Sequence, residues 1–390
     1  MPFWQAADGS LWESEGSFAR YVDSLAPYFD EVILSVPVFD RPQPSGSRVR
    51  AANVRLAPLP YFPGPRQFYP MLPRMRALLR AWVAQCDVIH LRVPSPAAIF
   101  AFKLAERMRK PVFLLVVGDY EALLPHLPYR GIKKVLFGWY VAFEERALRY
   151  MTTRALTFAN GAALREKHER QGARVIETKT TTLSQSDIGT REDVGAAGRI
   201  RALTVSRIDP RKGLRGLPAA IARLVTRGVD ISLDIVGPTI GQIGDEEGAA
   251  IEAEAQAAGV GDRVRLSGAV PLDRLMGMYR DYDLFILPTQ PGEGIPRVLL
   301  EAMANGLPVI TTDVSGIGSL IRNGVNGLLM GESSADAVAD AVTRVVTDGA
   351  LRRALIAGGY ATARLYTLEK QAADMMQAAG RELGIPLVAA

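Results

Sequence analysis

Residues 291–310 read Pro-Gly-Glu-Gly-Ile-Pro-Arg-Val-Leu-Leu-Glu-Ala-Met-Ala-Asn-Gly-Leu-Pro-Val-Ile, directly after the apolar run 284–288. Pro296 can occupy the first turn of a helix, where its missing N–H costs nothing, and Asn305-Gly306 can close that helix with a left-handed cap. The segment therefore predicts a loop, a short helix and a strand in succession, which is one repeat of a parallel α/β sheet.

The loop and the helix of this segment carry groups suited to an anionic, hydroxyl-rich ligand. Gly292 and Gly294 leave the loop without side chains at two positions, so a ligand can approach the backbone closely. The N–H groups and positive dipole end of the helix favour an anion. Glu293 lies on the loop and Glu301 in the helix, and a carboxylate accepts the paired hydroxyl donors that ribose and sugar rings supply. Arg297 opposes the dipole preference, which fits either a contact with a diphosphate or an ion pair.

A second cluster of candidate binding residues follows the predicted strand 202–206. Arg207 and Lys212 would meet at the carboxyl end of that strand, within the sequence Ser-Arg-Ile-Asp-Pro-Arg-Lys-Gly. Two cations there can hold a diphosphate through charge-assisted hydrogen bonds worth roughly 1.5–3 kcal/mol each. Such a pair replaces the metal ion that many sugar-nucleotide enzymes require, so we expect neither a metal nor another cofactor.

Short runs rich in Val, Ile and Leu alternate with stretches of helical period along the whole chain. This alternation predicts repeated βαβ units and parallel sheets. The predicted strands are 31–36, 87–91, 111–117, 154–158, 202–206, 231–236, 263–267, 284–288 and 307–311. The helices predicted in the first half lie near 16–29, 71–85, 95–109 and 131–151. Ligands of such sheets bind outside the carboxyl ends of the strands, so the loops directly after the strands are the candidate site.

The length of 390 residues predicts two domains, because one hydrophobic core rarely organises so long a chain. The polar stretch from Thr180 to Gly198 is typical of an interdomain linker. We expect an α/β protein with two Rossmann-like doubly wound domains facing across a cleft. The N-terminal domain would cover 1–185 and the C-terminal domain 186–370, with a helix in 371–390 packing back on the N-terminal domain.

Composition and charge restrict the class of protein. Hydrophobic residues make up 48% and charged residues 22% of the chain, which is ordinary for a folded soluble protein. The single Cys86 excludes an internal disulfide and suits a reducing compartment. Apolar runs are too short for a membrane span and the N-terminus lacks the layout of a signal peptide, so we expect a cytoplasmic protein. Residues 1–185 hold 25 Lys+Arg against 16 Asp+Glu, which fits an anionic partner or solubility alone.

Five motifs occur in order in the C-terminal half. They are Ser206-Arg-x4-Lys-Gly213, Leu233-Asp-Ile-Val-Gly237, Val264-Arg-Leu-Ser-Gly268, Tyr282-Asp-Leu-Phe-Ile-Leu-Pro288 and Glu293-x7-Glu301. Their order and spacing resemble the retaining glycosyltransferases of family 4, which have the two-domain GT-B fold. The resemblance assigns acceptor binding to the N-terminal domain and binding of the nucleotide-sugar donor to the C-terminal domain.

The same resemblance implies a role for each motif residue. Arg207 and Lys212 would bind the donor diphosphate, and Glu301 the ribose hydroxyls. The transferred sugar would be held by Glu293 and the backbone after it, namely Gly294, Ile295, Pro296 and Arg297. The loops at Gly237 and Gly268 would flank the base. The family is thought to keep the anomeric configuration by a front-face displacement in which the leaving phosphate helps to deprotonate the acceptor, so no protein nucleophile is expected.

The N-terminal half resembles the family less closely. The helix beginning at Gly16 matches the family's glycine-led first helix and implies a donor contact there, but the apolar strand that usually precedes it is missing or very short. The strand 111–117 often ends near a histidine in the family, whereas here it leads to Asp119. We expect Asp119 to orient the acceptor hydroxyl or to sense the sugar, which completes a catalytic set with Arg207, Lys212 and Glu293.

Segment 128–143 combines aromatic with basic side chains. They are Arg130, Lys133, Lys134, Phe137, Trp139 and Tyr140. This combination suits a membrane interface, and it suits equally an amphipathic helix packed on its own sheet.

The expected activity is transfer of a sugar from a nucleoside-diphosphate sugar to a hydroxyl of a glycan or lipid-linked acceptor, in the cytoplasm or at the inner face of the membrane, with no nucleic-acid partner. A nucleotide-sugar 2-epimerase-like enzyme is one alternative, although such enzymes need histidines near the sugar. Here His90 is predicted to be a core residue, and His126 and His168 to lie at the surface. A non-catalytic nucleotide-sugar-binding protein is the other alternative, motivated by the altered Gly118-Asp119 corner.

Overall fold

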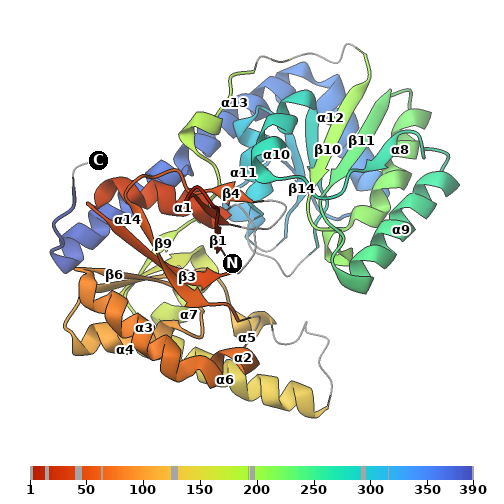
Figure 1. The fold of residues 1–390 in the computed structure, drawn as a ribbon. Coiled ribbons are helices and arrows are strands. Elements are labelled where there is room, and N and C mark those ends of the chain that lie inside the picture. Colours follow the sequence, from red (N-terminus) through yellow and green to blue (C-terminus); the bar gives the residue numbers. More distant parts are fainter. Residues whose placement is uncertain are drawn as a thin grey trace. The chain divides into compact units, whose positions relative to one another are not determined.

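The chain divides into two compact units, one of residues 1–180 with 369–390 and one of residues 181–368. The sequence places these boundaries near 185 and 370. A computed structural model describes residues 3–13, 17–39, 46–62, 65–123, 131–191, 193, 198–290, 296–314 and 316–388. Each unit is an α/β structure with parallel strands (Figure 1).

A six-stranded parallel sheet forms the centre of the second unit. Its strands are β10 (Ile200–Val205), β11 (Ile231–Val236), β12 (Val264–Leu266), β13 (Leu284–Leu287), β14 (Val309–Thr312) and β15 (Leu328–Met330). They lie in the order β12-β11-β10-β13-β14-β15, and every neighbouring pair is parallel. Counted within the unit this is 3-2-1-4-5-6, the strand order of the Rossmann fold, in which the order reverses between the first and fourth strands.

Helices cover both faces of this sheet (Figure 1). The helices α8 (Leu217–Thr226), α9 (Gly241–Ala257) and α12 (Ala335–Thr347) contribute to the hydrophobic core on one face. The helices α10 (Leu272–Met278) and α11 (Arg297–Ala304) contribute to the core on the other, and α13 (Gly349–Leu365) reaches both. Because both faces are covered, β13 and β14 are buried at every position, as their apolar sequences predict.

The first unit contains two sheets. The strands of one are β1 (Phe3–Gln5), β2 (Leu11–Glu13), β3 (Val32–Val38), β4 (Ser47–Arg48) and β5 (Val54–Pro60), in the order β4-β2-β1-β3-β5. The strands of the other are β6 (Ile89–Val93), β7 (Val112–Val116), β8 (Leu156–Asn160) and β9 (Val175–Thr178), all parallel and in chain order. The helices are α1 (Ser17–Leu25), α2 (Pro65–Phe68), α3 (Leu72–Gln85), α4 (Ala98–Arg107), α5 (Tyr120–Leu123), α6 (Ile132–Thr152), α7 (Ala162–Arg170) and α14 (Leu368–Leu383).

The predicted fold class is confirmed, and a strand is present at each predicted position. The expectation of a very short first strand is also confirmed. β1 and β2 have three residues each and pair as an antiparallel hairpin, of which β1 also pairs with β3 in parallel. Residues 14–16, which include Gly16, lie outside the described residues.

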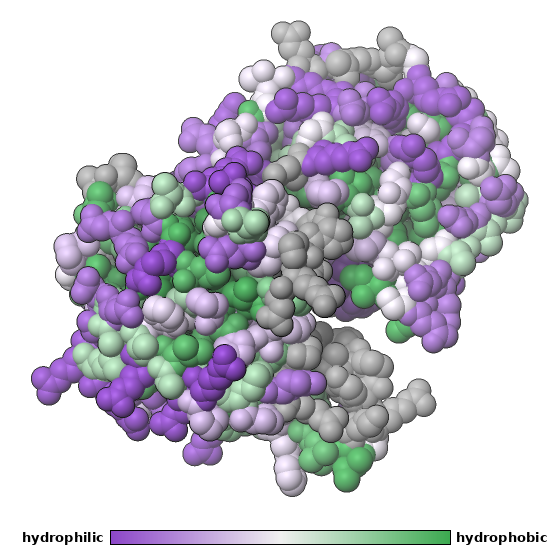
Figure 2. Space-filling view, viewed as in Figure 1, coloured by the Kyte–Doolittle hydropathy of each residue, from purple (hydrophilic) through white to green (hydrophobic). Residues whose placement is uncertain are grey.

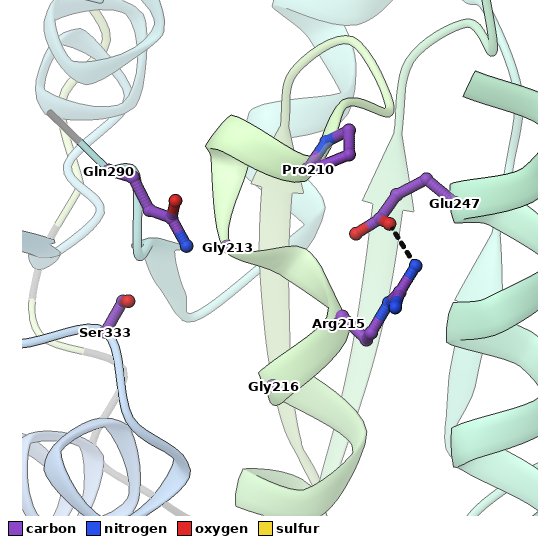
Figure 3. A pocket seen from close by; sticks show the side chains of 7 residues that line it. All are labelled: Pro210, Gly213, Arg215, Gly216, Glu247, Gln290 and Ser333. Carbon is purple, nitrogen blue, oxygen red and sulfur yellow. Dashed lines mark hydrogen bonds and ion pairs between the residues drawn. The ribbon is translucent and has the colours of Figure 1, made fainter. Parts of the chain in front are cut away.

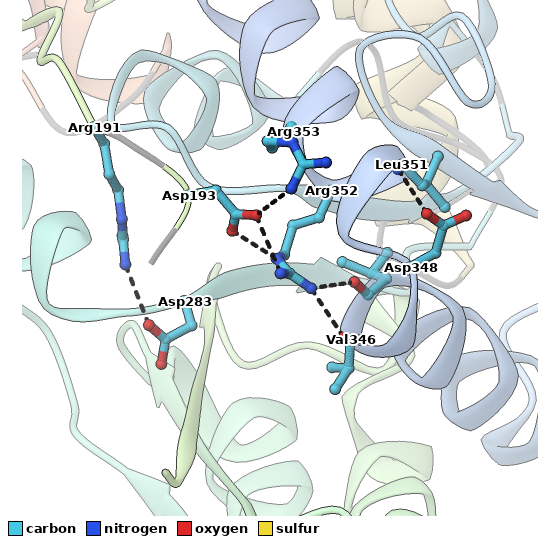
Figure 4. A network of polar contacts seen from close by, with 9 residues as sticks. Arg191, Asp193, Asp283, Val346, Asp348, Leu351, Arg352 and Arg353 are labelled. Atoms are coloured by element: carbon cyan, nitrogen blue, oxygen red, sulfur yellow. Dashed lines mark hydrogen bonds and ion pairs between the residues drawn. The ribbon is translucent and has the colours of Figure 1, made fainter. Parts of the chain in front are cut away.

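The interpretation of Thr180 to Gly198 as a linker is wrong for most of its described part, because the described residues after Thr180 belong to the second unit. Leu183 is fully buried in the core beside α11. Arg191 pairs with Asp283 at 3.2 Å. Asp193 pairs with Arg352 at 2.7 Å, as Figure 4 shows. Polar composition suggested an exposed linker, but these polar groups are ion-paired to their own unit.

The C-terminal helix α14 contacts the first unit. The Tyr21 hydroxyl lies 3.9 Å from the Met375 sulfur. Arg174 pairs with Glu382 at 2.8 Å. The N–H of Val388 donates to the carbonyl of Tyr28 at 3.1 Å. The helix at the end of the chain therefore completes the unit that the first 180 residues form.

His90 is half-buried and its ring nitrogens have partners, as the sequence prediction of a satisfied histidine requires. Its Nε2 lies 2.8 Å from the Tyr21 hydroxyl, and its ring stacks on Phe113 with 4.4 Å between centroids. Burial lowers the pKa of His90 from 6.5 to about 4. His168, by contrast, is 1% exposed. The prediction of a surface position for His168 is therefore wrong, while His126 lies outside the described residues.

The lowered pKa of His90 predicts a pH dependence of stability. Between pH 6.5 and about 4 the unfolded chain protonates this imidazole and the folded chain does not, so stability falls as the pH falls through that window. We expect the melting temperature of the wild type to drop more between pH 7 and pH 4 than that of His90→Gln, measured by circular dichroism. Parallel curves for the two proteins would contradict this origin of the pH dependence.

Candidate functional site

The candidate site lies where the strand order of the second unit reverses. β10 and β13 are neighbours at this point, and the loops that follow them leave the same edge of the sheet. The N–H of Gln290, after β13, donates to the carbonyl of Arg211, after β10, at 2.8 Å. Ligands of open α/β sheets bind at such a reversal, outside the carboxyl ends of the strands. Both sequence-predicted clusters therefore begin at this position.

The turn after β10 is built around Asp209. Its carboxylate accepts from the backbone N–H of Arg211 at 3.0 Å and pairs with the Arg211 guanidinium at 2.6 Å. The hydrogen bond from Arg211 holds the pKa of Asp209 down, to about 2. Lys212 follows and is 7% exposed, whereas Arg207 is exposed. Gly213 closes the turn with φ +66°, where a Cβ would overlap the carbonyl oxygen of Pro288.

Two glycine turns meet the Arg207 turn at the same edge of the sheet. Gly237 follows β11, and its N–H donates to the carbonyl of Gly268, which follows β12, at 2.8 Å. A Cβ on Gly237 would overlap the carbonyl oxygen of Ser206, the residue directly before Arg207. Gly268 has φ +65° and open space where its Cβ would be. The three turns that the sequence assigned to the diphosphate and the base are therefore contiguous.

Helix α11 begins and ends close to the predicted positions. Pro296 is the N-cap, one position before the predicted first turn, and Gly306 adopts the predicted left-handed conformation with φ +69°. Arg297 is the first helical residue and is exposed. Among the described residues no carboxylate pairs with Arg297, and both interpretations of this residue stay predictions.

Glu301 lies on the second turn of α11 and is 4% exposed. Its Oε1 accepts a hydrogen bond from the Thr182 hydroxyl at 2.6 Å, and its Oε2 accepts one from the Tyr279 hydroxyl at 2.9 Å. Sequence reasoning found Glu301 but missed both hydroxyl partners. Thr182 lies in a threonine-rich run with no motif, and Tyr279 precedes the motif that marks β13.

The part of the predicted sugar site on residues 291–295 lies outside the described residues. Glu293, Gly294 and Ile295 therefore stay predictions, as does the donor contact at Gly16. The structure does describe the two residues that flank this loop, Gln290 before it and Pro296 after it.

A pocket of about 420 Å³ opens at the same edge of the sheet (Figure 3). Its lining comes from the turn after β10, from α9, and from the segments after β13 and β15. The lining residues are Pro210, Gly213, Arg215, Gly216, Glu247, Gln290 and Ser333. The Arg215 guanidinium pairs with the buried Glu247 carboxylate at 2.6 Å. Pro210 and Gly213 belong to a motif that the sequence singled out, whereas Glu247, Gln290 and Ser333 come from segments far apart in the chain.

Asp119 follows β7 and begins α5 in the first unit. Its Oδ1 accepts from the N–H groups of Glu121 and Ala122 at 2.9 and 3.0 Å, and from Lys167 at 2.8 Å. Burial raises the pKa of Asp119, but the hydrogen bonds from Lys167 and these N–H groups outweigh it, so the pKa lies below its usual range. These contacts keep Asp119 ionised and fixed, and its role toward an acceptor stays a prediction.

Glu121 and Glu145 lie close enough to Asp119 to share a metal ion. The Lys167 ammonium already lies among the three carboxylates, 2.9 Å from Glu145 and 3.2 Å from Glu121. The negative charge of the three carboxylates is therefore partly balanced by Lys167, so the cluster does not require a metal ion for this purpose.

Comparison with known proteins agrees with this architecture. The family described as glycosyl transferases group 1 matches residues 190–362, which lie inside the second unit. Phosphatidyl-myo-inositol mannosyltransferase of Mycolicibacterium smegmatis is 30% identical over 310 residues, 78% of this chain and 74% of the relative. That of Mycobacterium leprae is 26% identical over 330 residues, 83% and 81% of the two chains. The crystal structure of Anabaena Alr3699/HepE in complex with UDP has a TM-score of 0.70 at 18% identity, covering 97% of this chain and 98% of that one.

The two α/β units and the likeness to solved structures, among them a glycosyltransferase of Rickettsia africae with a TM-score of 0.64, define a protein of the GT-B fold. The Mycolicibacterium relative is 30% identical over most of both chains, and a likeness of this extent indicates membership of the same family. The chain belongs to the glycosyl transferases group 1, and it is a glycosyltransferase.

Proposed function

We propose that this enzyme is a retaining glycosyltransferase of family 4, which transfers a sugar from a nucleoside-diphosphate sugar without a metal ion. The supporting observation is that three ligand-binding features follow the adjacent strands β12, β11, β10 and β13, where the strand order reverses. These are the cations Arg207 and Lys212 after β10, the glycine turns after β11 and β12, and Glu301 on the helix after β13. Cations suit a diphosphate, glycine turns without side chains suit a flat base, and a carboxylate suits the hydroxyls of ribose.

In the proposed reaction the acceptor hydroxyl oxygen bonds to the anomeric carbon as the bond from that carbon to the β-phosphate oxygen breaks. The hydroxyl proton passes to the departing phosphate oxygen, so the products are a glycoside and a nucleoside diphosphate. Arg207 and Lys212 would stabilise the charge that develops on the departing diphosphate, which is the part of the transition state where fixed cations help most. Attack and departure on one face keep the anomeric configuration.

For the acceptor we propose a lipid-linked or glycan hydroxyl. The relatives that match most of the chain are named for transfer of mannose to phosphatidyl-myo-inositol. Other relatives, which match over shorter segments, are named for amylovoran and colanic acid biosynthesis. These names favour an acceptor in cell-envelope or extracellular glycan assembly.

The proposal is tested with the purified protein, an excess of chelator, and a panel of UDP-, GDP- and dTDP-sugars, each with phosphatidylinositol or an oligosaccharide acceptor. We expect glycoside formation with at least one donor, undiminished by the chelator, and a product whose anomeric configuration by NMR equals that of the donor. Inversion of configuration, or activity that requires added Mg²⁺ or Mn²⁺, would contradict the proposed mechanism.

The same assay separates the two alternatives. An epimerase-like enzyme would release a free epimerised sugar and form no glycoside. A non-catalytic binding protein would bind a nucleotide sugar but consume none of it with any acceptor.

Contact of the first unit with an anionic membrane surface is the second part of the proposal. The helix α6 presents an apolar face to solvent, with Ile132 75% exposed and Trp139 72% exposed. Val135, Leu136 and Phe143 continue this face at helical spacing with exposures of 54%, 56% and 47%. Figure 2 shows hydrophobic residues gathered at the lower edge of the first unit, near the place where Figure 1 labels α6. Because these side chains are exposed, the alternative of a helix packed by this face on its own sheet loses support. No helix of the described residues is both long and apolar enough to cross a bilayer.

This contact predicts that the protein sediments with vesicles containing phosphatidylserine, and that Leu136→Ser with Trp139→Ser releases it. Each apolar side chain transferred into the interface contributes about 1.5–3 kcal/mol, so we expect the double variant to bind at least about tenfold more weakly. Ile243→Ser is the matched control, since Ile243 is 62% exposed on α9 of the other unit. Equal sedimentation of the three proteins would contradict a membrane role for α6.

A further inference from the structure

Glu301 is an interior carboxylate whose two partners are neutral. The hydroxyls of Thr182 and Tyr279 donate to its two different oxygens at 2.6 and 2.9 Å. Among the described residues no lysine or arginine forms an ion pair with Glu301. A buried anion without a cation is costly, so a merely structural role does not account for this arrangement.

With these two partners bound, the Glu301 carboxylate can still accept further hydrogen bonds. An ionised carboxylate has about four acceptor positions, two on each oxygen. Thr182 and Tyr279 each use one position, on Oε1 and Oε2 respectively. One position therefore remains on each oxygen of the same carboxylate. Two adjacent acceptors match the two adjacent hydroxyls of a ribose ring.

Thr182 is held in place by the backbone around it. The next residue, Leu183, is fully buried. Its N–H donates to the Thr181 hydroxyl at 3.0 Å, and its carbonyl accepts from the N–H of Leu368 at 2.7 Å. Thr182 itself is 2% exposed. The hydroxyl that reaches Glu301 therefore comes from a fixed segment of chain rather than from a free loop.

Tyr279 is held equally firmly on the other side. It is 0% exposed, and its ring lies 6.1 Å from that of Phe285 on β13. Burial, together with the charge of Glu301, raises the pKa of Tyr279 well above its ordinary value. The phenol therefore keeps its proton, and remains a donor, throughout the range of an enzyme assay.

We propose that Thr182 and Tyr279 are positioning residues that aim the Glu301 carboxylate at the adjacent hydroxyls of the donor's ribose. They act through Glu301 and do not themselves contact the ligand. The proposal rests on the proposed function, because it deepens the role of Glu301 as the ribose-binding residue.

The test uses calorimetric titration of the full-length protein with UDP, with GDP, and with the 2′,3′-dideoxy form of each. The quantity measured is the ratio of the two dissociation constants, dideoxy over ribo, for whichever base binds. We expect the wild type to prefer the ribonucleotide by about tenfold or more, since each hydrogen bond to a charged group is worth roughly tenfold in affinity. Thr182→Val and Tyr279→Phe should each reduce this preference by about threefold to tenfold. Thr182→Ser should restore it, and affinity for the dideoxynucleotide should stay within about twofold.

Two control variants remove buried hydroxyls elsewhere in the same unit. The Thr204 hydroxyl donates to the carbonyl of Ile286 at 2.7 Å, and the Tyr282 hydroxyl donates to Asp234 at 2.7 Å. Thr204→Val and Tyr282→Phe repeat the chemical changes away from Glu301, so they should leave the preference for ribose unchanged even if they lower the melting temperature.

The outcomes are distinguishable. If Glu301→Gln removes the ribose preference but Thr182→Val and Tyr279→Phe keep it, the positioning role is wrong and the proposed function stands. The positioning role is also wrong if the control variants lower the preference as much as the two test variants do. If the wild type shows no ribose preference, or binds no nucleotide at all, then the assignment of Glu301 as the ribose-binding residue is wrong. The positioning role of Thr182 and Tyr279 is then wrong as well.

Discussion

Glu301→Ala is expected to lower the affinity for a nucleoside-diphosphate sugar by about 100-fold or more. The variant removes both acceptors for the ribose, and hydrogen bonds to a charged group contribute about 1.5–3 kcal/mol each, so their joint loss exceeds about 3 kcal/mol, or two factors of ten. The affinity is measured by calorimetry, and the rate of glycoside formation with subsaturating donor should fall by a similar factor.

The change in stability should be smaller than the change in affinity. Loss of the carboxylate leaves the hydroxyls of Thr182 and Tyr279 without their acceptor, at about 1–3 kcal/mol each, but it also removes a buried anion. Asp193→Ala is the matched control, because this carboxylate is also largely buried in the second unit and pairs with Arg352. The control should lose stability and keep donor affinity. Wild-type affinity in a folded Glu301→Ala protein would remove the basis of the site assignment.

The second unit could be predicted largely from the sequence because its signals are local. Apolar runs mark the central strands, and glycine and proline mark the ends of α11. The predicted strand 231–236 coincides with β11, and the left-handed Gly306 is where the sequence placed it. Parallel strands at the centre of a sheet must be apolar on both faces, which is why each is visible without knowledge of its neighbours.

The strands that sequence reasoning missed outside the β1–β2 hairpin lie at sheet edges. β4, β5, β9 and β15 each end a sheet. An edge strand has one neighbour, so it can be short, or it can contain proline as β5 does at Pro58 and Pro60. Such strands lack the continuous apolar run that identifies a central one.

The candidate site was predicted residue by residue only where a motif marks it. Thr182 and Glu301 are in contact although 119 positions separate them, and no periodicity or spacing connects the two. The error on Thr180 to Gly198 has the same origin, since the partner of Asp193 is Arg352, 159 positions away. Pairing over such distances is a property of the packed unit and has no local signature in the sequence.

Gly237→Ala is expected to destabilise the second unit and to impair donor binding together. The backbone of Gly237 has φ +151°, and a Cβ there would overlap the carbonyl oxygen of Ser206. Backbone strain and overpacking together cost about 2–4 kcal/mol. The overlapped carbonyl belongs to Ser206, which directly precedes Arg207. A backbone shift that relieves the overlap would therefore also move Arg207, a residue of the proposed diphosphate site. Stability is measured by urea denaturation, and donor affinity by calorimetry on the fraction that stays folded.

Two other glycines separate the causes of this effect. Gly268 also has positive φ but open space around its Cβ position, so Gly268→Ala should show the strain alone, about 1 kcal/mol. Gly277 lies in α10 with no atom near its Cβ position, and Gly277→Ala should be neutral or stabilising by about 0.5–1 kcal/mol. Equal stability of Gly237→Ala and Gly277→Ala would mean that the turns after β10 and β11 are not packed as described. A loss of stability in Gly237→Ala with full donor affinity would instead show that the diphosphate is held without the Arg207 turn.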